Sequence, residues 1–386
     1  MAERFADRIR DFARPWELAT FIWIPAIILG YTGWYELRTS HALEDFGIFR
    51  RAATAVIHGD SPFVAPDPHA LAHFDKFVYP PSTAFLFAPF TALPLPVGQF
   101  LMFLLGLGAT FAALRLLGVR DWRCYGLSLM TPPVVNSLAL GAVTPFLLLG
   151  AAAVWHYRDR PGVAGPVAAL TAVTKVFLWP IGFWLLATRR LRAALLSVLL
   201  AAAVVVAGWA AIGFAGARSY PHLLRVLTDV EQGASYSPIA LVGLKGSSAT
   251  ATAFALTLAS LACVMWAARR DDGDRRAFAI VVAGAVLATP VLWLHYFQLL
   301  LVPIALYRPR LSGLWFVPLA LWLTPASHAN GSPWKISLAL AVFATIVLRT
   351  LAEGSTQPVA VRIEALGTSF RRRTPRVVGA ESPRGA

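Results

Sequence analysis

The sequence predicts an all-α polytopic membrane protein. Its 386 residues are 57% hydrophobic and only 14% charged, whereas a soluble domain carries about 25% charged residues. Apolar runs of membrane-spanning length recur along the chain, and a helix satisfies its own backbone polar groups inside a bilayer. The net charge of +14 is explained by arginines in short loops, as the positive-inside rule requires. We therefore expect membrane lipids, and no nucleic acid, as partners.

Three regions follow from this pattern. Residues 1–18 are basic and predict a cytoplasmic N-terminus. Residues 19–351 form the membrane domain, with about twelve spans and both termini inside. The polar, basic tail 352–386 is predicted to be disordered and cytoplasmic. The expected spans are 19–36, 81–93, 97–117, 134–154, 163–187 as two short spans, 193–213, 248–268, 277–293, 296–306, 312–326 and 335–351.

Two long polar loops, 37–80 and 214–247, are predicted to face outward. The first contains an apolar pattern at helical spacing from Phe46 to Ile57, which predicts a short amphipathic helix on the membrane surface. A second short helix is expected near residues 68–74, and another surface helix over 220–230. The same topology places 118–133 outside, although Arg120 and Arg123 there oppose the positive-inside rule.

Lys175 interrupts the apolar run 163–187. A single span would bury this lysine near the bilayer centre at a cost of several kcal/mol. Two short spans with Lys175 at the outer turn avoid that cost. Asp45, Lys175, the 214–247 loop and His295 then all lie on the outer side, as a functional site there requires.

Asp45 fits two roles. It begins the first amphipathic helix, where aspartate is a favoured N-cap. It also fits a general base that removes a proton from a hydroxyl group, with Glu44 as the rival carboxylate.

Lys175 and His295 also have structural and functional interpretations. Lys175 fits a lysine that extends its charge to the membrane surface, or a cation for a phosphate group. His295, within Trp293-Leu294-His295-Tyr296, fits an interfacial aromatic belt or a donor to the same phosphate. The segment Phe77-Val78-Tyr79-Pro80-Pro81 favours a rigid junction, with sugar stacking by Tyr79 as the alternative. No cysteine or histidine spacing indicates a zinc site, and we expect no metal.

A family resemblance rests on motifs in order. These are Asp45-Phe46, Arg50, Ala52-Ala53, Gly59-Asp60-Ser61-Pro62-Phe63, Phe77-Val78-Tyr79-Pro80-Pro81, Asn136 with Leu140-Gly141, Lys175 with the arginines after it, and Trp293-Leu294-His295-Tyr296. Together they resemble glycosyltransferase family 87, a GT-C family that includes polyprenyl-phosphate-mannose-dependent α-mannosyltransferases. The resemblance covers roughly residues 20–350.

The resemblance implies a GT-C fold and an inverting hexosyltransferase in the bacterial plasma membrane, with its active site facing outward. The donor would be a polyprenyl-phosphate sugar, with mannose as the sugar that the family likeness favours, and the acceptor would be a lipid-anchored glycan. No nucleotide or other cofactor would be used. Asp45 would be catalytic, and Lys175 and His295 would bind the donor phosphate. The further residues expected to contact substrate are Glu44, Arg50, Asp60, Tyr79, Asn136, Ser237 and Tyr296.

Two departures from the family pattern concern the substrates. Gly141-Ala142-Val143 stands where the family often has Gly-Gln followed by Asn, and Ser235-Tyr236-Ser237 stands where it has Asn-Gln-Ser. An arabinofuranosyltransferase on the same scaffold is therefore the alternative enzyme. A transporter or flippase is the alternative from another class, but its polar residues would lie near the bilayer midplane in repeated halves, whereas here they gather on one face.

Overall fold

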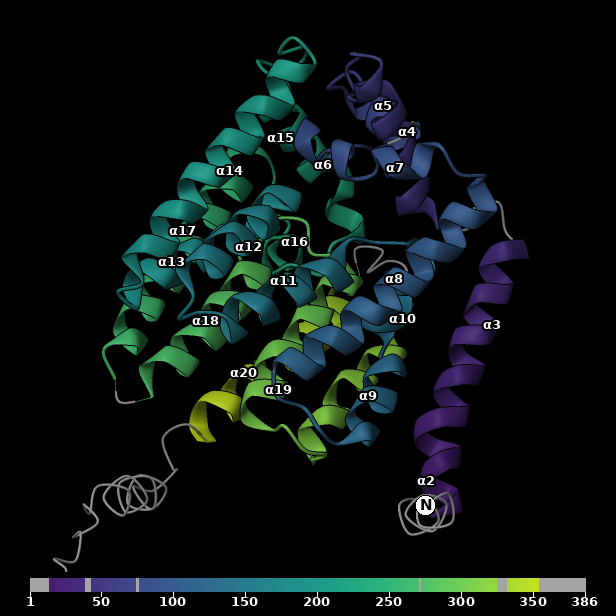
Figure 1. The fold of residues 1–386 in the computed structure, drawn as a ribbon, viewed down its shortest axis with the longest axis vertical. Coiled ribbons are helices and arrows are strands. Elements are labelled where there is room, and N and C mark those ends of the chain that lie inside the picture. The colour runs from purple at the N-terminus through teal and green to yellow at the C-terminus, as the bar shows by residue number, and fades with distance from the viewer. Residues whose placement is uncertain (1–13, 39–42, 74–75, 271, 325–331, 354–386) are drawn as a thin grey trace, which may run out of the picture.

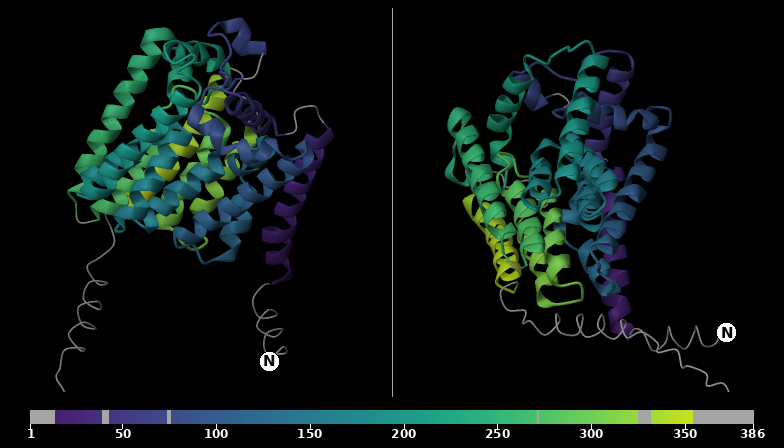
Figure 2. Two further views of the ribbon diagram at one scale, coloured as in Figure 1. Left: turned by 45° about the horizontal axis from the view of Figure 1, so that its top comes forward. Right: turned by 60° about the vertical axis from the view of Figure 1, so that its left-hand side comes forward.

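The computed structural model describes residues 14–38, 43–73, 76–270, 272–324 and 332–353. Every regular element within these ranges is a helix, which confirms the all-α class. The expected tail from residue 354 onward, and most of the basic N-terminal segment, lie outside the described residues. Figure 1 shows the arrangement of the helices, and Figure 2 shows it from two further sides.

The first part of the chain forms one long helical segment, a group of short helices and a set of packed helices. Their bounds are α2 (Pro15–Leu18), η1 (Ala19–Trp23), α3 (Ile24–Arg38), α4 (Glu44–Ile57), α5 (Pro68–His73), α6 (Pro81–Leu86), α7 (Ala88–Thr91), α8 (Leu95–Leu116), α9 (Trp122–Leu129), α10 (Pro132–Leu140) and α11 (Thr144–His156).

The second part alternates long helices with short helical turns. Their bounds are α12 (Pro161–Thr174), η2 (Val176–Leu178), α13 (Pro180–Ala187), α14 (Leu191–Ala211), α15 (Tyr220–Val230), η3 (Glu231–Ala234), α16 (Pro238–Val242), α17 (Gly246–Ala268), α18 (Gly273–Leu287), η4 (Leu294–Leu300), α19 (Leu301–Tyr307), η5 (Gly313–Leu323) and α20 (Pro333–Glu353).

Within the described residues, five helices are long and apolar enough to cross a membrane. They are Pro15–Tyr35, Leu95–Leu116, Leu191–Ala211, Gly246–Ala268 and Pro333–Ala352. A sixth is reached if α10 and α11, which are bent by 117° at their junction, count as one broken span. The structure thus supports a helical membrane protein but not the predicted number of about twelve spans, because several apolar runs are divided into shorter helices.

The predicted span 81–93 is wrong. It folds as α6, with six residues, and α7, with four. At 1.5 Å per residue, such helices are far shorter than the roughly 30 Å of a bilayer's hydrocarbon core. Pro81, Pro89 and Pro94 divide the segment, because proline lacks the N–H that continues a helix. The Thr83 hydroxyl donates to the Val173 carbonyl at 3.1 Å, which fixes α6 beside the end of α12.

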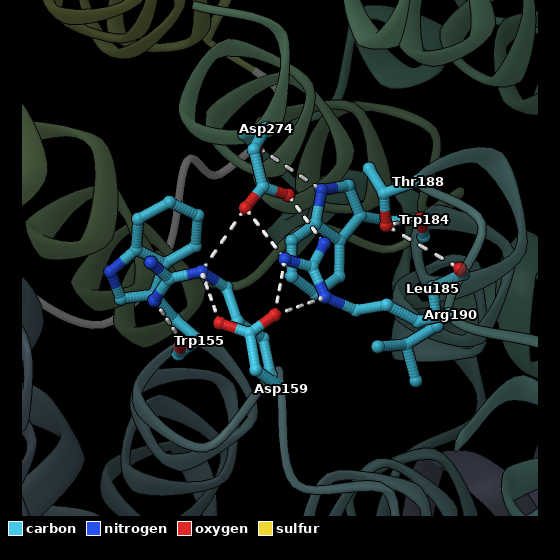
Figure 3. Close-up of polar contacts among 8 residues, drawn as sticks. Trp155, Asp159, Trp184, Leu185, Thr188, Arg190 and Asp274 are labelled. Atoms are coloured by element: carbon cyan, nitrogen blue, oxygen red, sulfur yellow. Dashed lines mark hydrogen bonds and ion pairs between the residues drawn. The ribbon is translucent and has the colours of Figure 1, made fainter. Parts of the chain in front are cut away.

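One end of the molecule, which we call the arginine-rich end, gathers the turns 156–160, 188–190, 269–276 and 307–311. Arg190 donates to both Asp159 and Asp274, at 2.8 and 2.7 Å, and Arg158 donates to Asp274 at 3.1 Å. Figure 3 shows these pairs. The Arg275 guanidinium lies 4.4 Å from the centre of the Tyr307 ring. These contacts place the arginine clusters near Arg190, Arg275 and Arg308 at one end of the molecule.

The position of 118–133 also differs from the prediction. Arg123 pairs with Glu17 at 3.1 Å, and the Leu311 N–H donates to Asp121 at 3.1 Å. This segment therefore lies at the arginine-rich end, not opposite it. The physical reason is that 81–93 does not cross, so α8 returns the chain one crossing earlier than expected. Arg120 and Arg123 then obey the positive-inside rule.

The opposite end, which we call the loop end, carries α4 to α7 and α15, at the top of Figure 1. Lys76 forms an ion pair with Glu231, and the Tyr220 hydroxyl donates to the Val78 carbonyl at 2.8 Å. Phe63 stacks on Trp209, with ring centres 5.4 Å apart. The two loops predicted to lie on one side, 37–80 and 214–247, are thus joined by direct contacts.

Between the two ends, small residues let the helices pack closely. α12 packs along α14, α8 along α11 and α17 along α18. A Cβ at Gly165 would lie 2.8 Å from the Ala193 carbonyl oxygen, so a larger side chain there would separate α12 from α14. Close helix contact through small residues is typical of membrane proteins.

Candidate active site

Asp45 is the second residue of α4. The N-cap position belongs to Leu43, which has a left-handed backbone with φ of 48° and no side-chain cap. The N-cap role that Asp45 could have had is therefore excluded. Phe46 and Phe49, which are both fully buried, anchor the apolar face of α4. Phe49 stacks on Phe87, with ring centres 4.4 Å apart.

Gly141 supports the start of this helix. Its φ is +63°, in the region that favours glycine, and a Cβ there would lie 2.8 Å from the Leu43 side chain and 2.9 Å from that of Phe46. The turn between α10 and α11 can therefore approach α4 closely only with glycine. The Leu140-Gly141 motif thus helps to hold Asp45 in place.

Lys175 lies at the break between α12 and η2, where its backbone is extended, with φ of −151° and ψ of 109°. The predicted interruption of the apolar run at this lysine is confirmed. Its Nζ donates to the Tyr79 hydroxyl at 2.8 Å. The same Nζ lies 4.1 Å from the centre of the Tyr296 ring and 4.8 Å from that of Tyr79. The ammonium group is held by two aromatic side chains from separate parts of the chain.

Tyr79 is positioned by an aromatic cluster. Its ring centre lies 4.9 Å from that of Phe49 and 5.6 Å from that of Phe77. Burial raises the pKa of Tyr79 well above its usual value, and nearby Tyr296, Asp45 and Tyr220 add to this effect. The hydroxyl therefore stays protonated at neutral pH, so it can accept from Lys175 and still donate a hydrogen bond.

His295 is 4% exposed, and neither of its ring nitrogens has a hydrogen-bond partner among the described residues. Its ring is parallel to that of Trp293, at 6.5 Å, and edge-on to that of Tyr296, at 4.7 Å. Leaving a buried polar group unpaired costs about 1–3 kcal/mol. An unpaired buried histidine therefore needs an explanation, and a ligand that accepts or donates a hydrogen bond here would supply one.

The Asp45 carboxylate lies close enough to this group to interact electrostatically with Lys175, Tyr79 and Tyr296. It makes no hydrogen bond or ion pair with any residue in the described part of the chain. Burial raises its pKa to about 6, an effect that Lys175 opposes and Glu44 reinforces. Lys175 is thus the main counter-charge of Asp45 without forming a contact ion pair with it. A carboxylate that is ionised at neutral pH but not neutralised by direct contact can accept a proton.

The structure brings together five predicted residues, Asp45, Tyr79, Lys175, His295 and Tyr296, from four separate segments. Glu44 lies beside them, but its side chain is exposed. Two further residues that were expected to contact substrate, Arg50 and Asp60, are not part of this group. Arg50 donates to the Phe90 and Leu93 carbonyls at 3.3 and 3.0 Å, and so fixes the end of α7. Asp60 is exposed in the turn after α4 and makes no described contact with the group.

Ser237 and Asn136 contact the group only indirectly. Ser237 is buried as the N-cap of α16, where its hydroxyl accepts from the Ala240 N–H and donates to the Pro290 carbonyl at 2.8 Å. Together with Ser235, it holds the segment that leads to His295. Asn136 lies in α10, which packs against η4, the helix that contains His295.

Three residues of this region were not predicted. Phe177 stacks on Tyr296, with ring centres 5.1 Å apart, and so completes the surroundings of Lys175. Tyr220 holds the backbone next to Tyr79, and Glu231, 5% exposed, pairs with Lys76. An acidic residue at the end of a surface helix gave the only sequence signal for Glu231. Among the described residues, no group of three ligating side chains could hold a metal ion.

The fold and site together define a helical membrane protein with a carboxylate, a cation and aromatic side chains grouped at one end. The chain belongs to glycosyltransferase family 87, whose model matches residues 77–293, more than half of its length. It is therefore a glycosyltransferase. The matched range includes Tyr79 and Lys175, and Asp45 and His295 lie outside it. No curated protein and no solved structure is significantly similar to the chain.

Proposed function

We propose that the protein transfers a hexose from a polyprenyl-phosphate sugar to a lipid-anchored glycan, with inversion at the anomeric carbon. Mannose is the hexose that we propose. The observation that carries this proposal is the Asp45 carboxylate, which has no contact partner in the described residues and lies near Lys175 and the unpaired His295. One carboxylate suffices for direct displacement, in which it serves as the base.

In the proposed reaction, an acceptor hydroxyl oxygen attacks the anomeric carbon of the donor while Asp45 removes the hydroxyl proton. The bond between the anomeric carbon and the phosphate oxygen breaks, and its electron pair leaves with the polyprenyl phosphate. Lys175 and His295 are assigned to this phosphate, where they stabilise the charge that develops on it. The Tyr79 hydroxyl donates a hydrogen bond to the same phosphate.

A lipid-linked donor suits the position of the site. α4 is amphipathic, and its buried face carries Phe46, Phe49 and Val56. That face packs against α6 and α7, so α4 is held at the loop end, at the ends of the spanning helices, where the phosphate of a polyprenyl phosphate also lies. The positive-inside rule places the arginine-rich end in the cytoplasm, so the site at the loop end is proposed to face the outside of the bacterial plasma membrane.

An assay of the purified protein tests this function. The protein is supplied with synthetic polyprenyl-phosphate mannose or polyprenyl-phosphate arabinofuranose, and transfer to a lipid-anchored oligosaccharide is measured. We expect transfer from the mannosyl donor, with the product anomer opposite to that of the donor. Transfer from the arabinofuranosyl donor alone would overturn the sugar assignment, and retention of configuration would overturn the mechanism.

A further inference from the structure

A pocket of about 550 Å³ opens at the arginine-rich end, between α13 and α17. Its volume is within the range of roughly 300–1,000 Å³ that small-ligand sites occupy. Phe183 and Leu186 on α13 and Met265 on α17 form an apolar wall, and Arg189 and Arg269 add two positive charges. The pocket lies at the end of the molecule opposite Asp45, so it is separate from the candidate active site.

The side chains of the two pocket arginines are not used to hold the described part of the fold together. Within the described residues, the side chains of Arg189 and Arg269 make no hydrogen bond or ion pair, and both are exposed. The neighbouring Arg190 instead bonds to Asp159 and Asp274 and lies 5.2 Å from the centre of the Trp184 ring (Figure 3). Asp159 and Asp274 therefore neutralise Arg190, and no described acid pairs with Arg189 or Arg269.

The backbone of Arg189 is a second, independent observation. The Arg190 N–H donates to the Leu185 carbonyl at 2.8 Å and the Arg189 N–H to the Leu186 carbonyl at 3.0 Å. This is the pattern of a Schellman motif, with Arg189 at the position where glycine is usual. Its φ is +61°, a strained value for a residue with a side chain. The chain thus has an arginine where the fold alone favours glycine.

The surroundings place the pocket at the edge of a membrane. Trp266 is 51% exposed on α17, with the Arg270 guanidinium 4.5 Å from the centre of its ring. Exposed tryptophan beside arginine is typical of the boundary between lipid head groups and acyl chains. Leu186, 50% exposed, opens the apolar wall of the pocket toward the lipid.

We propose that this pocket binds one anionic phospholipid of the surrounding membrane. Arg189 and Arg269 hold the phosphate of the head group, and an acyl chain lies along Phe183, Leu186 and Met265. Basic pockets between helices on this side of membrane proteins suit such head groups. An apolar wall beside two charges that pair with no described residue matches a lipid better than a free anion.

The test uses the purified full-length protein in detergent. Native mass spectrometry counts the phosphatidylglycerol molecules retained during a titration, and phosphatidylcholine serves as the neutral lipid. The variant Arg189→Gly/Arg269→Gln removes both charges, and its glycine relieves the backbone strain instead of adding to it. The control Arg192→Gln/Arg310→Gln removes two exposed charges from the same end, outside the pocket.

We expect the wild type and the control to retain phosphatidylglycerol in preference to phosphatidylcholine. The pocket variant should bind the first phosphatidylglycerol roughly thirtyfold more weakly, since each of the two basic residues near the membrane surface contributes about fivefold. Equal affinity in the pocket variant, or an equal loss in the control, would overturn the proposal. Competition by millimolar inorganic phosphate that displaces the lipid completely would show a free-anion site instead and would overturn the lipid assignment.

Discussion

The Lys175 ammonium donates to the Tyr79 hydroxyl at 2.8 Å, although 96 positions separate the two residues in the sequence. This contact joins the first loop to the break between α12 and η2. It also turns the lysine toward Asp45 and His295, both of which it influences electrostatically. A lysine that merely reached the membrane surface would point to water instead.

Replacement of Lys175 tests its assignment to the donor phosphate. Lys175→Ala should weaken donor binding roughly tenfold to a hundredfold, because a hydrogen bond to a charged group contributes about 1.5–3 kcal/mol. Lys175→Arg should retain part of the affinity, since it keeps the charge but not the compact geometry. Equilibrium binding of a polyprenyl-phosphate sugar measures this, with Lys245→Ala as a matched control in the second loop. Unchanged affinity in Lys175→Ala would remove the lysine from the phosphate site.

The pH dependence of transfer tests the state of Asp45. A general base must be ionised, and burial raises the pKa of Asp45 to about 6. Activity should therefore fall as the pH drops through about 6, and it should also decline on the alkaline side, because burial lowers the pKa of Lys175 to about 7 and a neutral lysine loses its attraction for the phosphate. Lys175 lowers this pKa, so the acid limb of any residual activity in Lys175→Ala should move to higher pH. Rate profiles against pH, measured under single-turnover conditions, test this. An acid limb that moved to lower pH in Lys175→Ala would contradict the account.

The pair Lys76–Glu231 should stabilise the contact between the two loops. Lys76→Ala leaves the buried Glu231 without its partner, and we expect a loss of about 1–3 kcal/mol in unfolding free energy, toward the lower figure because the Lys76 side chain is 34% exposed. Lys76→Ala/Glu231→Gln should recover part of the loss, since no unpaired charge remains. Thermal unfolding in detergent measures both, with the exposed Arg225→Ala as control. A double variant that is no more stable than Lys76→Ala would mean that the pair is not coupled.

Labelling of single cysteines tests the topology. In a background without Cys124 and Cys263, an impermeant thiol reagent added to intact cells should label Asp60→Cys. Arg120→Cys and Arg310→Cys, at the arginine-rich end, should react only after the membrane is opened. Reaction of Asp60→Cys from the cytoplasmic side alone would reverse the orientation of the whole site.

The sequence was sufficient for features that depend on local composition. A lysine within an apolar run predicted the break at Lys175, and basic turns predicted the arginine-rich end. The span 81–93 could not be distinguished from two short helices, because thirteen mostly apolar residues suit a surface segment or a short crossing equally well. That single error also misplaced Arg120 and Arg123.

The roles of individual site residues depended on tertiary contacts. Arg50 and Ser237 were expected at the substrate, yet Arg50 holds the end of α7 and Ser237 holds the segment before His295. Both motifs are better explained by support of the site than by contact with a ligand. The unpaired nitrogens of His295 follow from the packing of η4, which no local pattern specifies.

Asp45→Asn tests the central assignment most directly. Asparagine keeps the size of the side chain but cannot accept a proton as a carboxylate does. Because burial raises the pKa of Asp45, the carboxylate destabilises the folded state above that pKa, so the variant should be at least as stable as the wild type at pH 7. The single-turnover rate of sugar transfer should fall on the order of a hundredfold to ten-thousandfold, and Glu44→Gln should stay near the wild-type rate. A near wild-type rate in Asp45→Asn would contradict the assignment of Asp45 as the base.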